Sequence, residues 1–324
     1  MMIISAEEQR RLIDMKEVIE QVEIALQAFS ASKTDTPIRT SLPFGKENAG
    51  LVMPSVAEEL EAMGLKYVTV VPGNAQVEKK VIHGVVLLSD IKTGEPLALL
   101  EGSYLTQIRT GALSGAATKY LARDNATRLG IIGTGQQSGG LCEAIFAVRD
   151  IQAIYIYNRS EEKAKKFSTF VKERFGKEVV ICKHPDEVVQ NCDVLVTATT
   201  SMSPVFSEKL QPGIHVNAVG SFKPTMQELP SHAIQSATKV VVESLTAAME
   251  ETGDLQVPIQ EGVFSENDIH AELGKIISGV QLGRTSAEEI TVFKSVGLAV
   301  VDIIVAKYIY EKALSQNAGV LVEL

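Results

Sequence analysis

Residues 128–140 of this chain read RLGIIGTGQQSGG, an apolar stretch that runs directly into a glycine-containing turn. The pattern predicts a β-strand, a turn through Gly133 and Gly135, and a helix from Gln136 to Val148. Gly133 permits the sharp turn, and Gly135 lets the backbone approach a pyrophosphate at the helix N-terminus. The third glycine of the usual G-x-G-x-x-G pattern is Ser138 here, so the match is partial.

Further apolar runs follow this motif, and stretches of helical or loop character separate them. The runs are AIYIYN (153–158), VVIC (179–182), DVLVTAT (193–199), IHVNAVG (214–220) and KVVVES (239–244). Continuous apolar strands that alternate with helices are typical of a parallel sheet covered on both faces. A glycine turn without a nucleotide is the alternative, but a turn that opens such a series favours dinucleotide binding. The sequence therefore predicts a Rossmann-type α/β domain from about residue 128 to residue 243.

The flanking regions follow other patterns. Apolar positions at helical spacing predict one helix over residues 6–30, and a second helix, rich in small residues, over 105–121. Between them, strand patterns follow one another without helices, which indicates an antiparallel or mixed sheet. These strands are LVMPSV (51–56), LKYVTVV (65–71), IHGVVLLSD (82–90) and PLALLEG (96–102). The tail from Ser286 onward is predicted to be helical and to return to the N-terminal region.

Composition and charge narrow the classes of function. The chain has 324 residues, 45% of them hydrophobic, which suits two globular domains. A net charge of −9 argues against a broad nucleic-acid or anionic-membrane surface. The N-terminus lacks the apolar stretch of a signal peptide, and Asp302 and Lys307 interrupt the apolar run at 296–310. No membrane span is therefore expected.

Cysteines and histidines give no sign of a metal site. Cys142, Cys182 and Cys192 form no CxxC pair and are expected to be reduced, buried thiols of a cytoplasmic protein. The spacing of four histidines matches no metal-ligand motif, so no metal is expected. These histidines are His184, His215, His232 and His270.

The end of the second predicted strand bears on the choice of cofactor. A domain selective for NAD usually has Asp or Glu there to hold the ribose 2′-hydroxyl, whereas this chain has Asn158, Arg159 and Ser160. A guanidinium pairs well with a 2′-phosphate, which a carboxylate would repel. The alternative is that Arg159 only solvates the strand end. The sequence favours NADPH, with NADH as the weaker alternative.

Together with the glycine turn, four segments resemble the ornithine cyclodeaminase/mu-crystallin family. They are MGLKYVTVVPGN (63–74), LTQIRTGALSGAATKYLA (105–122), GIHVNAVGSFKPTMQEL (213–229) and FKSVGLAVVDI (293–303). The resemblance implies an α/β fold with a Rossmann dinucleotide-binding domain inserted into an α+β substrate and dimerisation domain. The expected segments are 1–122 for the first part of that domain, 123–292 for the Rossmann domain and 293–324 for the helical return. The family exchanges hydride between nicotinamide and the α-carbon of an amino or imino acid.

Four residues are candidates for the substrate side. Lys66 lies on an apolar strand, where a lysine must find a partner or snorkel to water. The resemblance implies that Lys66 faces the substrate carboxylate or imine nitrogen, and burial near Arg109 and Arg39 would lower its pKa. The fork of Arg109 suits bidentate capture of a carboxylate, and Arg39 matches a second carboxylate-binding arginine. His83 matches a substrate-lining position, although a lone histidine is more often structural.

The cofactor side is assigned from the glycine turn, the strand ends and the resemblance. The assigned residues are Thr110, Gly133, Thr134, Gly135, Gln136, Gln137, Asn158, Arg159, Ser160, Thr199, Val219, Gly220, Ser295 and Val296. Thr199 and residues 218–221 lie at carboxyl ends of predicted strands, where open α/β sheets bind ligands, and are expected to bracket the nicotinamide ribose. Residues 295–297 are expected to close over the nicotinamide.

One departure from the family pattern separates the possible activities. Cyclodeaminases of this family carry an acid/base aspartate two residues past the glycine, where this chain has Phe222. Phenylalanine transfers no proton, so the sequence favours reduction of a ready-made cyclic imine. The expected reaction is NADPH-dependent reduction of Δ1-pyrroline-2-carboxylate to L-proline, and also of Δ1-piperideine-2-carboxylate to L-pipecolate, by a homodimer. The alternatives are ornithine cyclodeaminase, then alanine dehydrogenase, or a mu-crystallin-like NADPH-binding protein without turnover.

Overall fold

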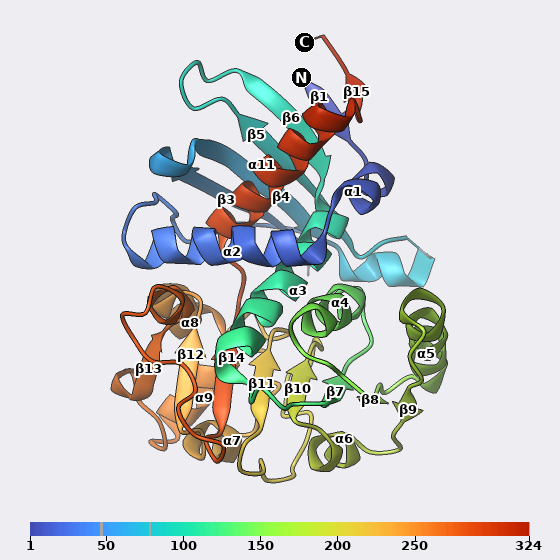
Figure 1. Cartoon of the computed structure of the whole chain (residues 1–324), viewed down its shortest axis with the longest axis vertical. Helices are drawn as coiled ribbons and strands as arrows, with labels where there is room; N and C mark the ends of the chain where they lie inside the picture. Colours follow the sequence, from blue (N-terminus) through green and yellow to red (C-terminus); the bar gives the residue numbers. More distant parts are fainter. Residues whose placement is uncertain (46–47, 78, 324) are drawn as a thin grey trace. The chain divides into compact units, whose positions relative to one another are not determined.

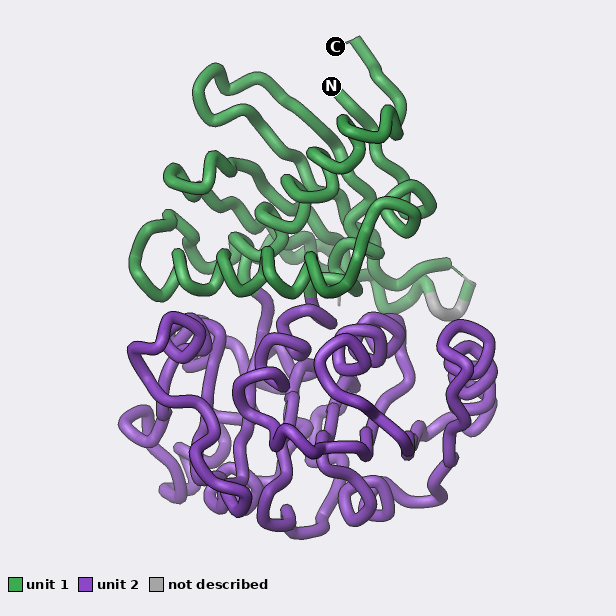
Figure 2. The backbone as a smooth tube through the Cα atoms, viewed as in Figure 1, with its two compact units in different colours: residues 1–109, 298–324 green, residues 110–297 purple. Residues whose placement is uncertain are grey.

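The structure, a computed structural model, describes residues 1–45, 48–77 and 79–323. The chain forms two compact units, which Figure 2 colours separately. Unit 1 consists of Met1–Arg109 and Leu298–Leu324, and unit 2 is the intervening segment Thr110–Gly297. The first division falls inside helix α3 (Gly102–Leu121), whereas the sequence placed a boundary in the loop after residue 122. The second falls at residue 297, rather than after residue 292.

The described part of unit 1 contains a seven-stranded sheet of order β15-β1-β6-β5-β4-β3-β2. Its strands are β1 (Met2–Ile4), β2 (Thr40–Phe44), β3 (Asn48–Ala57), β4 (Ala62–Val70), β5 (Ile82–Ser89), β6 (Pro96–Glu101) and β15 (Val320–Leu321). Strands β2 to β6 pair antiparallel and β1 pairs parallel with β6, which agrees with the expectation of an antiparallel or mixed sheet. The sequence did not predict β1, β2 or β15. Strand β2 is exposed at every position, so no alternation of polar and apolar residues marks it.

Among the described residues, three helices belong wholly to unit 1: α1 (Ala6–Leu12), α2 (Met15–Ser30) and α11 (Ala299–Gln316). The single helix predicted over residues 6–30 is wrong, because the chain is extended at Ile13 and starts a new helix after Asp14. The Asp14 side chain accepts hydrogen bonds from the amides of Lys16 and Glu17, which caps α2. Helix α11 packs against α2, β3, β4 and β5 (Figure 1), so the predicted return of the tail is confirmed.

Unit 2 is built on an eight-stranded sheet, counted over the described residues, of order β13-β12-β14-β11-β10-β7-β8-β9. Its strands are β7 (Arg128–Ile132), β8 (Ala153–Tyr157), β9 (Val180–Ile181), β10 (Val194–Thr197), β11 (His215–Ala218), β12 (Lys239–Val242), β13 (Ile269–Glu272) and β14 (Thr291–Lys294). Every pairing is parallel, and all six predicted strands are present. Strands β13 and β14 were not predicted.

Strand β14 corrects the prediction that the tail is helical from Ser286. It is buried at all four positions and lies between β12 and β11 in the sheet. A short apolar run buried on both faces has no periodicity that separates a strand from a helix. Because the apolar sequence of α11 follows almost at once, the two elements read as one helix.

Helices cover both faces of the unit 2 sheet (Figure 1). The helices of unit 2, of which α3 is shared with unit 1, are α3, α4 (Ser138–Val148), α5 (Glu161–Phe175), α6 (Pro185–Asn191), α7 (Ser231–Gln235), α8 (Leu245–Glu251), α9 (Gly253–Gln260) and α10 (Leu273–Ile277). Alternate residues of β10 join different hydrophobic clusters: Val194 and Val196 belong to one and Leu195 to the other. Successive strand residues point to opposite faces, so each face has its own core, as the α/β prediction requires.

Two expectations from composition concern these cores and the helices. Cys142, Cys182 and Cys192 are free and buried, as predicted. No helix among the described residues is both long enough and apolar enough to span a bilayer. Short 3-10 turns complete the fold at Glu58–Leu60, Pro72–Val77 and Glu266–Asp268.

Candidate active site

The turn after β7 has the geometry that the two glycines predicted. Gly133 has φ +97°, and a Cβ added there would lie 2.7 Å from the carbonyl oxygen of Ala198. A Cβ added to Gly135 would meet no atom within 4 Å. Gly133 is therefore required by the backbone, whereas Gly135 leaves open space beside it for a ligand. Helix α4 begins at Ser138, two residues later than predicted.

Side chains around this turn indicate what would fill the space. Ser138, at the third position of the motif, is buried, and its Oγ donates to the carbonyl oxygen of Gly133 at 2.8 Å. The buried Thr134 Oγ1 and Gln137 Oε1 have no hydrogen-bond partner within the described chain. A hydroxyl donor and a carbonyl acceptor left unsatisfied beside an open glycine fit the phosphates and ribose of a dinucleotide.

The end of β8 holds the glycine turn in place. Asn158 Oδ1 accepts a hydrogen bond from the amide of Thr134 at 3.1 Å, and its Nδ2 donates to the carbonyl oxygen of Ser160 at 3.0 Å. The Ser160 hydroxyl caps α5. The side chain of Arg159 is exposed. Asn158 thus orders the turn, while Arg159 is left accessible to a bound molecule.

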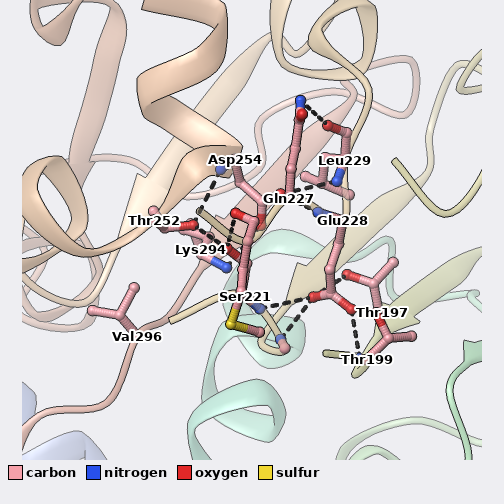
Figure 3. A network of polar contacts seen from close by, with 12 residues as sticks. Thr197, Thr199, Ser221, Gln227, Glu228, Leu229, Thr252, Asp254, Lys294 and Val296 are labelled. Carbon is pink, nitrogen blue, oxygen red and sulfur yellow. Dashed lines mark hydrogen bonds and ion pairs between the residues drawn. The ribbon is translucent and has the colours of Figure 1, made fainter. Parts of the chain in front are cut away.

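A buried carboxylate joins the carboxyl ends of β10 and β11, as Figure 3 shows. Glu228 is fully buried and accepts hydrogen bonds from the amides of Thr199 at 2.6 Å, Gly220 at 2.7 Å and Ser221 at 3.2 Å. The hydroxyl of Thr197 donates to the same carboxylate at 3.1 Å. One side chain therefore fixes two strand ends that were predicted to bracket the nicotinamide ribose.

The network continues through Asp254 to strand β14 (Figure 3). Asp254 Oδ1 accepts from the amides of Glu228 and Leu229 at 2.6 and 2.9 Å. Its Oδ2 lies 2.8 Å from Lys294 Nζ, and both side chains are fully buried. Burial, followed by the charge of Asp254, raises the pKa of Glu228 above its ordinary value, while Lys294 acts in the opposite direction.

A second buried carboxylate fixes the segment that follows β14. Glu243, directly after β12, accepts from the hydroxyl of Ser295 at 2.9 Å and from the amide of Val296 at 2.6 Å. The amide of Gly297, whose φ is +99°, donates to the same carboxylate. Residues 295–297 are thereby held at the carboxyl end of the sheet. The predicted cofactor residues Thr199, Gly220, Ser295 and Val296 all contact Glu228 or Glu243.

In unit 1, the two predicted catalytic residues share one acid. Lys66 of β4 lies 2.7 and 2.8 Å from the carboxylate oxygens of Asp302 on α11. The Nε of Arg109, on α3, lies 3.0 Å from Asp302 Oδ1. All three side chains are buried. Two cations and one anion leave an excess of one positive charge in this cluster, which attracts an anionic ligand.

Burial changes the acidity of Lys66. Desolvation, the largest cause, and the charges of Arg109 and Arg39 lower its pKa, while Asp302 raises it; together they bring the pKa from 10.5 to about 8. Thr106, one turn before Arg109, has a buried hydroxyl with no partner among the described residues. The cluster is thus a charged, partly unsatisfied site that suits a small polar ligand.

Two other predicted substrate residues lie differently. Arg39 is half-buried directly before β2, and its charge acts on Lys66. His83 lies within β5, exposed, and pairs with Thr69 of β4. Because Lys66 pairs with Val86, the side chains of His83 and Lys66 point to opposite faces of the sheet. The structure therefore does not bring His83 to the Lys66 cluster.

Sequence reasoning missed the carboxylates that organise both sites. Asp302 was noted only as an interruption in an apolar run, yet a lone acid in a buried helix signals a charged partner. Glu243 ends the apolar strand KVVVES, which carries the same signal. Glu228 lies in a loop and Asp254 lies in the first turn of α9, where acidic residues are common, so the sequence around them gives no sign of burial. Within the described residues, no group of three or more acidic, histidine or cysteine side chains is arranged to hold a metal.

A parallel sheet covered on both faces, with an open glycine turn at its carboxyl edge, defines the dinucleotide-binding class of oxidoreductases. The chain belongs to the ornithine cyclodeaminase/mu-crystallin family, whose model matches residues 1–317. It is 64% identical to a Delta(1)-pyrroline-2-carboxylate reductase of Bacillus cereus over the full length of both chains.

Solved structures agree with this assignment. The Delta(1)-pyrroline-2-carboxylate reductase of Thermococcus litoralis, in complex with NADH and L-proline, is 40% identical with a TM-score of 0.95. That comparison covers 99% of this chain and 100% of the other. An archaeal alanine dehydrogenase dimer with bound NAD is 37% identical with a TM-score of 0.92, and covers 100% of this chain and 99% of its own. The resemblance read from the sequence is confirmed.

Proposed function

We propose that this protein reduces Δ1-pyrroline-2-carboxylate to L-proline with a nicotinamide dinucleotide as the hydride donor. The observation that carries the proposal is the buried cluster of Lys66, Asp302 and Arg109, with its single excess positive charge. The full-length reductase relative at 64% identity supports the choice of substrate. Δ1-Piperideine-2-carboxylate, which has the same carboxylate and imine in a larger ring, is a second expected substrate.

The cluster is suited to hold a carboxylate beside an imine. Arg109 offers guanidinium donors in a fork that matches a carboxylate, and Arg39 adds positive charge. A substrate carboxylate neutralises the excess charge of the cluster, so its binding offsets the cost of keeping that charge away from water. When bound, the reduced nicotinamide supplies a hydride to the α-carbon.

Lys66 is the proposed proton donor to the imine nitrogen. A pKa of about 8 leaves it protonated at neutral pH but readier to release a proton than an ordinary lysine. Hydride on the α-carbon and a proton on nitrogen together convert the C=N bond into the CH–NH of proline. Asp302 holds the Lys66 ammonium through both carboxylate oxygens and so orients the donor.

Phe222 argues for imine reduction over cyclodeamination. It directly follows Ser221, whose amide Glu228 binds, and the ammonium of Lys223 lies 5.8 Å from its ring centroid. Cyclodeamination requires a group that moves protons while ammonia leaves, and phenylalanine has none. Ornithine cyclodeaminase, alanine dehydrogenase and a non-catalytic NADPH-binding role are the alternatives.

NADPH is the proposed cofactor, with NADH as the weaker alternative. The end of β8 presents no carboxylate to repel a 2′-phosphate, because Asn158 occupies that position and is committed to the turn. The exposed guanidinium of Arg159 is the proposed phosphate partner.

A homodimer in the cytoplasm is the proposed state of the protein. The apolar sequence at 298–309 would suggest an interface helix, but α11 is buried in its own unit and gives no support for a dimer. The support comes instead from the sheet face opposite α11. Tyr67 and Val85, paired on that face, are 40% and 38% exposed, and Leu42 on β2, which β3 separates from β4, is 51% exposed.

A substrate panel with matched variants tests the proposal. Loss of NADPH absorbance is followed with both cyclic imines and with pyruvate plus ammonia, and ammonia release is followed with L-ornithine and oxidised cofactor. Imine reduction is expected to dominate, and Lys66→Met and Arg109→Met are expected to abolish it while NADPH still binds. Lys92→Met, an exposed lysine in the same unit, is the control. Proline formation from L-ornithine at a rate rivalling imine reduction would overturn the proposal.

A further inference from the structure

Buried acidic side chains lie at the carboxyl edge of the unit 2 sheet, and the proposed reaction assigns them no chemical role. Glu228, Asp254 and Glu243 are buried there, and Lys294 is the buried cation paired with Asp254. In their ionised forms these four groups are three anions and one cation, with a net charge of −2. Burying such charge is costly, so its retention in the fold calls for a physical reason.

Burial and Asp254 raise the pKa of Glu228, whereas the hydrogen bonds donated to Glu228 and Glu243 favour the ionised form of these side chains. The amide of Thr199 donates to one oxygen of Glu228, and the amides of Gly220 and Ser221 donate to the other. The amide of Val296 and the hydroxyl of Ser295 donate to different oxygens of Glu243. Amide groups only donate, so carboxylates surrounded by them are matched to the charged form.

The groups held by these carboxylates are those predicted to surround the nicotinamide. Glu228 fixes Thr199 and Gly220, and Glu243 fixes Ser295 and Val296. Open α/β sheets bind their ligands outside the carboxyl ends of the strands. The charge is also preorganised, because the hydrogen bonds to backbone leave the carboxylates no freedom to turn away.

A nicotinamide ring is neutral when reduced and carries a positive charge when oxidised. Fixed negative charge in a buried setting stabilises the oxidised form more than the reduced form. We propose that Glu228 and Glu243 are positioning residues that also bias the bound cofactor toward its oxidised, cationic form and so favour hydride release. This inference rests on the proposed function, since it requires a nicotinamide dinucleotide at the carboxyl edge.

A purely structural role makes a different prediction. If Glu228 and Glu243 only hold the backbone, their replacement weakens the binding of both cofactor forms by the same factor. If they act through charge, the oxidised form is affected more. The ratio of the two dissociation constants therefore separates the roles without reference to turnover.

The experiment compares Glu228→Gln, Glu243→Gln and Glu228→Asp with the unmodified protein. Fluorescence of the reduced cofactor gives its dissociation constant, and competition gives that of the oxidised form. Each glutamine variant is expected to weaken the binding of the oxidised cofactor roughly tenfold more than that of the reduced cofactor. This factor corresponds to the loss of one unit charge that acts over about 10 Å at an effective dielectric constant near 20. Glu228→Asp, which keeps the charge, is expected to leave the ratio near that of the unmodified protein. Glu261→Gln, an exposed acid in the same unit, is the control.

The outcomes separate this inference from the proposed function. Equal weakening of both forms overturns the inference and leaves the proposed function standing. Failure of the unmodified protein to bind either form overturns the proposed function itself. Should both glutamine variants fail to fold, the unmodified protein carries the test, because the bias requires it to bind the oxidised form more tightly than the reduced form.

Discussion

Replacing Asp302 with asparagine removes the carboxylate that Lys66 and Arg109 share in a fully buried setting. The change keeps the size of the side chain, so its main effect is electrostatic. Asparagine leaves two cations without a counter-charge. Removing one partner of a buried ion pair typically lowers the free energy of unfolding by about 3–5 kcal/mol. Arg109 is unable to reduce this cost, because a guanidinium does not lose its proton in proteins.

Lys66, by contrast, is able to lose its proton, so the loss of stability caused by Asp302→Asn depends on pH. Its pKa is about 8 in the folded protein against 10.5 in the unfolded chain. Asp302 is one of the groups that raise the folded value, so Asp302→Asn lowers the pKa of Lys66 further. Below pH 8, the unmodified folded protein keeps the proton, whereas the variant loses it on folding. The extra cost in the variant therefore grows by about 1.4 kcal/mol for each pH unit below 8, until its own Lys66 pKa is reached.

Urea unfolding at pH 6, 7 and 8 measures this difference in the free energy of unfolding. The penalty of Asp302→Asn is expected to be largest at pH 6 and to shrink toward pH 8. Glu311→Gln is the matched control, since it removes an exposed carboxylate from the same helix and is expected to cost less than about 1 kcal/mol at every pH. A penalty that stays constant from pH 6 to 8 would show that Asp302 does not govern the protonation of Lys66.

Three further predictions concern the proposed function. The kcat/KM for imine reduction is expected to fall as pH rises through about 8, because Lys66 then loses its proton; a profile flat to pH 10 would contradict its role. Arg159→Asp is expected to raise the KM for NADPH by about ten- to a hundredfold, the value of a charge-assisted contact, with little change for NADH. An unchanged KM for NADPH would place the 2′-phosphate elsewhere. Light scattering at micromolar concentration is expected to show a dimer that Tyr67→Lys dissociates; a monomeric unmodified protein would refute the proposed interface.

The sequence predicted the elements whose physical cause is local. The strands from β7 to β12 were found because each is a continuous apolar run, and Gly133 was found because its turn requires a positive φ. The break at Ile13–Asp14 was missed because apolar residues at helical spacing continue across it, although Asp14 is a typical capping residue. Local patterns thus locate elements better than their ends.

The candidate sites show the same division. Lys66 was singled out because a lysine on an apolar strand needs a partner, and Arg109 because its fork suits a carboxylate; the family resemblance supported both. The partner itself, Asp302, lies 236 positions from Lys66, so no local pattern joins them. Glu228 likewise contacts Thr199, 29 positions away, and only the folded sheet brings the two residues together. His83 was expected to line the substrate site, but the register of β4 and β5 places its side chain on the face opposite Lys66. The comparison of single residues with a family pattern contains no information on strand register.

The order of the segments along the chain has a consequence for synthesis on the ribosome. Helix α11 covers one face of the unit 1 sheet and supplies Asp302, but it follows all of unit 2 in the chain. The strands β1 to β6 therefore leave the ribosome long before the helix that buries their apolar face. During that interval Lys66 and Arg109 lack their acidic partner, and the sheet surface is open to association with other nascent chains. Unit 2 is continuous in the chain and is free to fold before α11 is synthesised, so the completion of unit 1 is expected to come last.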